Sequence, residues 1–156
     1  MFTIQLEEPC LENYFEPPED PLGELSEFEI GLARFCFEYN HHVSIQIGDE
    51  SRRVFLFPDI WKLLERLPEK ITQLSLGRRI EIEFPDNSME INFIPVDDKI
   101  NCIFRKYGTE HKVNSTELAR SQVLEVLGHL LNELIQLAVD RGYIKPEEAH
   151  EFLKTG

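Results

Sequence analysis

The residues best suited to chemistry are two adjacent histidines, His41 and His42. Two imidazoles can bind a metal, and Glu38 or Asp49 is near enough in sequence to add a carboxylate. A zinc site normally takes three or four protein ligands at a recognisable spacing, and no such set surrounds this pair. The alternative is a polar turn, which Asn40-His41-His42 favours. We therefore keep His41 and His42 as a weak candidate site and expect no metal.

A second set of residues that could do chemistry lies near the C-terminus. Glu125, His129 and Glu133 are four residues apart, a spacing that places all three on one face of a helix. A histidine between two carboxylates can act as a general base. The same face also carries Asn132 and Gln136, which is typical of a solvated helix surface, and the spacing matches no known metal motif.

The motifs that usually identify an enzyme are missing from the sequence. There is no G-x-S-x-G elbow, no P-loop and no G-x-G-x-x-G, and the eight glycines occur singly. His111 and His150 have no evident partners. These observations favour a protein that is not an enzyme. We assign no catalytic residue and expect no cofactor.

The most distinctive feature is the distribution of charge. The formal net charge is −13, and residues 1–30 hold nine of the 29 acidic residues but no lysine or arginine; the first basic residue is Arg34. Such a run is usually a solvated arm. It can also be a docking segment for a basic partner, because complementary fields raise association rates and specificity.

Apolar residues between these carboxylates, such as Leu11 and Leu25, indicate that the segment packs against something. Prolines at four positions break regular structure over 7–25, which predicts an acidic loop or arm. The only tryptophan, Trp61, lies off the main apolar line of its helix and could anchor an interface, although core packing is the simpler interpretation. The candidate interaction residues are Glu7, Glu8, Glu12, Tyr14, Phe15, Glu16, Glu19, Asp20 and Trp61.

The bulk composition excludes several classes of protein. A strongly negative chain repels phosphate backbones and anionic headgroups, so we expect neither nucleic-acid nor membrane binding. No apolar run approaches the roughly 20 residues of a spanning helix, and the N-terminus lacks a secretory signal. Three widely spaced cysteines, Cys10, Cys36 and Cys102, form no even disulfide framework, which favours a cytoplasmic protein with reduced thiols.

The first half of the chain alternates in a way that predicts strands. Residues 2–6 and 43–47 alternate apolar and polar side chains, and 53–57 is a short apolar run. We interpret 28–39 as two further strand segments joined by a bulge near Ala33. A helix then begins near Ile60 and is interrupted by Pro68, which suits the first turn of a second short helix.

The second half predicts an antiparallel meander followed by two helices. Residues 80–84, 89–93 and 100–104 alternate clearly, and a short strand is expected at 111–114. Ser115 or Thr116 would cap a long helix that carries an apolar stripe from Val123 to Ala138. Gly142 would end that helix, and a terminal helix would start at Pro146.

Runs of strands followed by helices point to a single α+β domain over 1–156. Its antiparallel sheet is covered by the long C-terminal helix and by the shorter, proline-interrupted helix. We expect a non-enzymatic interaction module, such as an adaptor, regulator or immunity-like protein, that binds a basic partner protein through the acidic N-terminal segment. The eleven phenylalanines and a free strand edge would also allow a homodimer. The alternative is a small-molecule-binding domain or enzyme with a pocket between the sheet and the helices.

Overall fold

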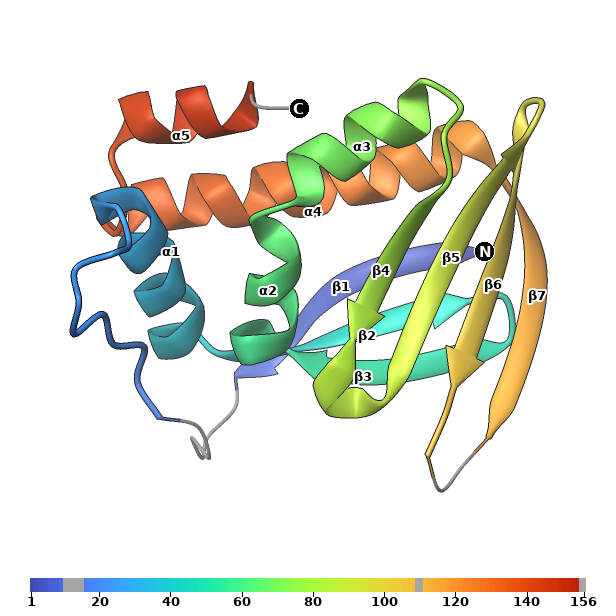
Figure 1. Ribbon diagram of the computed structural model, residues 1–156, viewed down its shortest axis with the longest axis horizontal. Coiled ribbons are helices and arrows are strands. Elements are labelled where there is room, and N and C mark those ends of the chain that lie inside the picture. Colours follow the sequence, from blue (N-terminus) through green and yellow to red (C-terminus); the bar gives the residue numbers. More distant parts are fainter. Residues whose placement is uncertain (10–15, 109–110, 155–156) are drawn as a thin grey trace.

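The computed structural model describes residues 1–9, 16–108 and 111–154, and within them the strands form two antiparallel sheets. Figure 1 shows the four-stranded sheet in front, with its strands crossing those of the three-stranded sheet behind. The first sheet has the order β1-β2-β3 and the second the order β4-β5-β6-β7. The α+β class is confirmed, but the single sheet expected from the sequence is replaced by two.

The three-stranded sheet is built from β1 (Phe2–Pro9), β2 (His41–Ile47) and β3 (Glu50–Phe55). Register pairs Phe2 with Ile47 and Ile4 with Ile45, so alternate apolar side chains share one face. Gly48 lies between β2 and β3 with φ +56°, a left-handed conformation that glycine adopts without strain. In chain order, β1 precedes the first helix and β2 and β3 follow it, so this sheet joins segments that the helix separates.

The four-stranded sheet is the predicted meander. It consists of β4 (Ile80–Phe84), β5 (Met89–Val96), β6 (Lys99–Lys106) and β7 (Lys112–Ala119). Ile82 is paired with Ile91, and Ile91 with Phe104, so one face of the sheet is apolar and buried. The opposite face carries the polar side chains of the same strands.

Among the described residues, five α-helices complete the fold: α1 (Glu27–Glu38), α2 (Trp61–Leu64), α3 (Leu67–Ser75), α4 (Arg120–Asp140) and α5 (Pro146–Leu153). Helix α4 runs along one end of both sheets, with α3 and α5 beside it (Figure 1). The stripe expected on α4 is buried, including Val123, Leu127 and Leu134. Pro68 stands in the first turn of α3, as the sequence predicts.

The inner faces of the two sheets and α4 enclose one core. Phe2 of β1 meets Phe93 of β5 edge to face, with ring centroids 5.6 Å apart. Cys36 and Cys102 are buried in this core as free thiols, and burial raises the pKa of Cys102 to about 12. Cys10 lies outside the described residues. Within the described parts of the chain, no helix is long and apolar enough to cross a bilayer.

The two strand segments predicted over 28–39, in the first half of the chain, are wrong. Residues 28–38 are not strands but belong to α1, with Tyr39 as its C-cap, and the apolar residues of α1 recur at helical as well as alternate spacing. Ser26 caps the helix: its hydroxyl accepts from the backbone N–H of Glu29, and the Glu29 carboxylate accepts from the backbone N–H of Ser26. This capping box satisfies two otherwise unpaired donors and selects the helix.

The last strand of the meander is also longer than predicted. Strand β7 continues through Ser115 and Thr116 to Ala119, because both residues pair with β6 in register. The long helix therefore begins at Arg120 without a side-chain cap. The predicted end is confirmed, since Gly142 follows the helix with φ +80°.

Candidate functional site

The first candidate site is an acidic surface made by two distant parts of the chain. Helix α5 lies against α1: the rings of Phe28 and Phe152 are 4.8 Å apart, and Lys145 Nζ is 3.5 Å from a carboxylate oxygen of Glu27. The acidic N-terminal segment is thereby joined to a second acidic group on α5. We call this surface the acidic end; its residues are Glu16, Glu19, Glu24, Glu27, Glu29, Glu147, Glu148 and Glu151.

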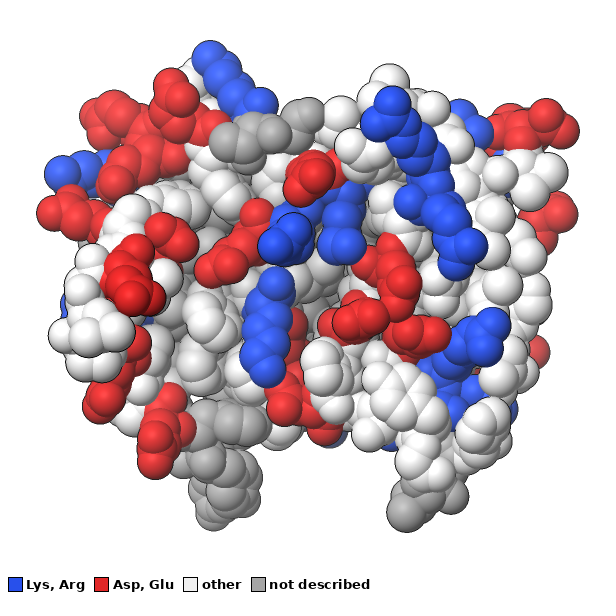
Figure 2. All heavy atoms as spheres, in the orientation of Figure 1, with Lys and Arg blue, Asp and Glu red and all other residues white. Residues whose placement is uncertain are grey.

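Figure 2 shows negative side chains gathered at one end of the molecule, over α1, α5 and the segment before α1. Glu16, Glu19 and Glu24 are exposed, and none of them has an ion pair among the described residues. A group of unpaired carboxylates produces a negative potential that extends into solvent. The charge asymmetry noticed in the sequence is thus a localised surface in the fold.

Asp20 has a different role from its neighbours. Its carboxylate oxygens accept hydrogen bonds of 2.9 Å from the backbone N–H groups of Glu24 and Leu25. These bonds fold the segment before α1 into a local turn, and Leu25 is partly buried there. Asp20 therefore shapes the acidic end, while Glu16, Glu19 and Glu24 supply its exposed charge.

The other predicted interaction residues are dispersed. Glu7 and Glu8 belong to β1, where the Glu8 carboxylate pairs with Arg53 of β3. Glu12, Tyr14 and Phe15 lie outside the described residues. Trp61 is half-buried and stacks on Phe57 with a centroid distance of 5.2 Å. The structure does not bring Trp61 into the acidic end.

His41 and His42 are not at a turn, which corrects the sequence interpretation. Both lie in β2, where successive side chains point to opposite faces of the sheet. His41 Nδ1 is 2.7 Å from the carbonyl oxygen of Glu7, and its ring contacts Tyr39. The ring of His42 lies 5.0 Å from that of Phe55. The two imidazoles therefore cannot converge on one metal ion.

Glu125, His129 and Glu133 do lie on one face of α4. His129 Nε2 is 3.0 Å from Glu133, and the His129 side chain is 73% exposed. All three line a hollow of about 570 Å³ between α4 and β1. The face is only partly solvated, because β1 approaches it.

The second candidate site is a groove between the helical segment and the free edge of β4, which we call the charged groove. Its volume is about 380 Å³. One wall carries Lys62, Arg66 and Lys70, and the other carries Glu81 and Glu83. Positive and negative side chains stand side by side over α2 and β4 in the middle of Figure 2.

The basic wall of the charged groove is partly engaged. Lys62 Nζ is 2.9 Å from the carboxylate of Asp86, and Lys70 Nζ donates to the carbonyl oxygen of Glu81 at 2.6 Å. Lysine at a strand edge protects it from pairing with another chain. Arg66 has no ion pair within the described ranges, so it is the cation most available to a ligand.

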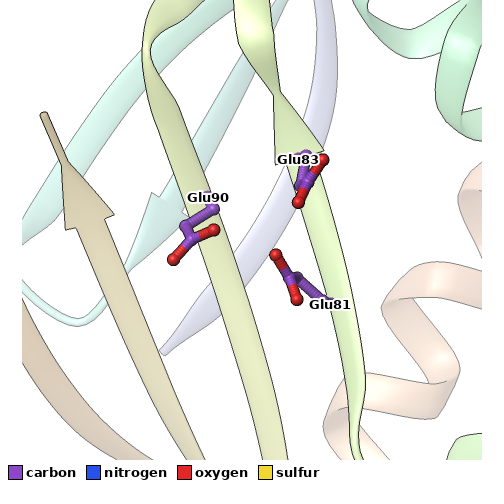
Figure 3. Close-up of side chains that lie close together, drawn as sticks. All are labelled: Glu81, Glu83 and Glu90. Carbon is purple, nitrogen blue, oxygen red and sulfur yellow. The ribbon is translucent and has the colours of Figure 1, made fainter.

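The acidic wall contains three crowded carboxylates, from Glu81 and Glu83 on β4 and Glu90 on β5 (Figure 3). Their oxygens all lie within 4.8 Å of one another. Glu83 and Glu90 are cross-strand neighbours, and Arg105 reaches Glu90 at 3.7 Å. Hydrogen bonding to Glu83 and Glu90, together with their negative charge, raises the pKa of Glu81 to about 7.

These three oxygens are suited to a hard cation such as Ca²⁺, which prefers carboxylate ligands. Exposed acidic groups are common without an ion, however. The cluster by itself is explained as a protonated network, because one shared proton relieves the repulsion among the three groups.

The charged groove was not predicted from the sequence, although the spacing of its basic residues indicates one of its two walls. Lys62, Arg66 and Lys70 are four residues apart, which aligns them along one side of the helical segment. In the sequence, the residues of the acidic wall are simply the polar residues that alternate with apolar ones in two strands, so they do not indicate a site. Bringing the two walls together depends on the packing of α3 beside β4, which no local pattern encodes.

Comparison with known proteins adds no identification. The chain matches no protein-family model, no curated protein and no solved structure.

Proposed function

We propose that this protein is a non-enzymatic interaction module, such as an adaptor, regulator or immunity-like protein, that binds a basic partner protein through the acidic end. One observation carries the proposal: the first turn of α1, which directly follows the acidic N-terminal segment, lies beside acidic helix α5, so carboxylates from distant parts of the chain lie at one end of the molecule. A localised negative field steers a basic partner and makes the encounter sensitive to salt.

The test is a pull-down with two variants of equal net charge. The acidic-end variant carries Glu16→Gln, Glu19→Gln and Glu24→Gln. The opposite-end variant carries Asp97→Asn, Asp98→Asn and Glu117→Gln, three exposed carboxylates in the β5–β6 turn and on β7. Both remove three negative charges from a net −13, so the overall charge is matched.

The tagged proteins are incubated with lysate of the source cell at about 50 and 300 mM salt, and captured proteins are identified by mass spectrometry. We expect a basic protein to be captured by the wild type at low salt, lost with the acidic-end variant and kept by the opposite-end variant. Equal capture by all three proteins at both salt concentrations would refute the proposal.

The charged groove favours a second function, the binding of a small zwitterion. Its opposed walls would pair the anionic group of the ligand with Arg66 and the cationic group with Glu83. Its volume lies within the usual range for small-molecule sites.

Thermal shift assays with a panel of free amino acids would test this function. A ligand-induced rise in melting temperature that is lost in both Arg66→Gln and Glu83→Gln would support zwitterion binding. If no amino acid raises the melting temperature of the wild type, free amino acids are excluded as ligands.

A further inference from the structure

A long groove between α4 and α5 opens beside the acidic end. Its volume is about 750 Å³. Its floor is apolar and is formed by Ile135, Val139, Pro146, Ala149 and Leu153. The last three recur on α5 at a spacing that places them on one side of the helix. We call it the α4–α5 groove.

The walls above this floor are polar. On α4 they are formed by His129, Asn132, Glu133 and Gln136, and on α5 by His150. No lysine or arginine is among the described residues that line the groove. The floor would therefore attract an apolar surface, and the walls would not repel positive charge.

Carboxylates follow the groove mainly on its α4 side. On α4, Glu133 lines it, and Asp140 lies one turn beyond Gln136, which donates to it at 2.8 Å. On α5, exposed Glu147 is three residues from His150 and so neighbours it on the helix surface, just outside the lining of the groove. Negative charge thus follows the α4 side of the apolar channel, and Glu147 adds a carboxylate just outside its α5 side.

We propose that the α4–α5 groove binds a basic amphipathic helix of the partner protein. This inference rests on the proposed function and names the part of the partner that is recognised. Helix-in-groove recognition places apolar side chains at i, i+3 or i+4 and i+7 on the floor of a groove. Lysine and arginine beside that apolar ridge would face Glu133 and Asp140 on α4 and Glu147 next to the groove on α5.

The dimensions of the groove fit a short helix. Helix α5 has eight residues, which is about 12 Å of helix. A partner helix of two to three turns would cover this length and place three apolar side chains on the floor. A second copy of this chain fits less well, because it would bring another acidic end against the same carboxylates.

The experiment uses the full-length protein and two synthetic helical peptides. Both have leucine at i, i+3, i+4 and i+7; one has lysine at the remaining positions and the other has glutamate. Binding is measured by calorimetry, and the site is located by amide chemical shifts in a ¹⁵N-labelled sample. We expect the leucine–lysine peptide to bind and to shift amides of α4 and α5, and the leucine–glutamate peptide not to bind.

Two variants make the site falsifiable. Val139→Asn and Leu153→Gln each add a polar group to the floor at a half-buried position, which the fold should tolerate. Each variant should reduce the affinity for the leucine–lysine peptide about tenfold, which is the usual effect of losing a central interface contact. Leu76→Gln, at a 64% exposed leucine on the far end of α3, is the control and should leave affinity unchanged.

The outcomes separate this inference from the function on which it rests. If the peptide binds but neither floor variant weakens it, the groove is not the site, although the acidic end still attracts positive charge. If the leucine–glutamate peptide binds equally well, the role of the carboxylates is refuted. If binding is lost only with the acidic-end variant, the proposed function stands and the helix-binding groove does not.

Discussion

Glu50 shows how a single buried carboxylate joins the two sheets. It lies at the start of β3 and is only 5% exposed. Its carboxylate pairs with Arg52 at 3.1 Å and with Lys112 of β7 at 2.5 Å, and it accepts a hydrogen bond from Asn114 of β7. The hydrogen bond and charge of Lys112 are the main reason that the pKa of Glu50 is lowered.

Replacing Glu50 with Gln should destabilise the fold by about 2 kcal/mol at pH 7, because a charged hydrogen-bond acceptor is lost between the sheets. A lowered pKa contributes stability above the unfolded value of 4.5, and this contribution is lost as the pH falls through the folded value. The difference between the wild type and Glu50→Gln should therefore shrink in acid. Urea unfolding at pH 7 and about pH 3 measures it.

Asp86→Asn is the control for this prediction, since it breaks an exposed pair with Lys62 and should cost at most about 1 kcal/mol. If Glu50→Gln is no more destabilising than Asp86→Asn, the network does not link the sheets energetically.

Glu81 should show the opposite dependence on pH. Its pKa is raised from 4.5 to about 7, so the folded protein gains stability from protonation below 4.5 and loses it as the pH rises through 7. Glu81→Gln removes this titration and should become more stable than the wild type as the pH increases from about 5 to 8. Thermal unfolding across this range measures the difference. Parallel curves for both proteins would contradict a crowded carboxylate network.

At the scale of elements, helix α1 depends on a close approach between its backbone and the turn after α4. A Cβ added to Gly31 would lie 2.3 Å from the carbonyl oxygen of Tyr143, which is too close for any side chain. The arrangement holds α1 beside α5 and so builds the acidic end. Glycine at this position is therefore a packing requirement.

Gly31→Ala should destabilise the protein by about 1–3 kcal/mol, the usual cost of overpacking against backbone. Gly128→Ala is the matched control, because Gly128 is also helical but nothing lies within 4 Å of an added Cβ. The control should stabilise α4 by about 0.5–1 kcal/mol through helix propensity. Chemical denaturation of the two variants should thus give changes of opposite sign, and equal changes would refute the role assigned to Gly31.

The same element shows what the sequence predicts and what it does not. The β4–β6 meander was predictable because one face is wet and the alternation is clear. Helix α1 was missed because its apolar residues also fit a strand period, and only the capping box of Ser26 and Glu29 distinguishes the two. The histidine pair was misplaced because polar residues can occupy a strand such as β2 as well as a turn.

The sites depend on packing between distant elements, which limits prediction from sequence further. The negative charge before α1 was evident, but its continuation onto α5 requires the contact of Phe28 with Phe152, 124 positions away. Likewise the charged groove requires α3 to lie beside β4. Local periodicity reports which face of an element is buried, not which other element covers it.

At the scale of the whole molecule, the protein combines one continuous core with an uneven surface. The charged groove, the hollow between α4 and β1 and the α4–α5 groove all open at this surface. The largest asymmetry is electrostatic: carboxylates gather over α1 and α5 (Figure 2). A negative surface of this kind can steer a partner of opposite charge.

The most direct test of this account is a titration with fluorescein-labelled oligolysine of about 20 residues, followed by anisotropy at about 50 mM salt. The wild type, the acidic-end variant and the opposite-end variant are compared. We predict that the acidic-end variant binds at least about fivefold more weakly than the wild type and that the opposite-end variant changes by less than about twofold. Equal weakening of both variants would mean that only net charge matters, and it would contradict a recognition surface at the acidic end.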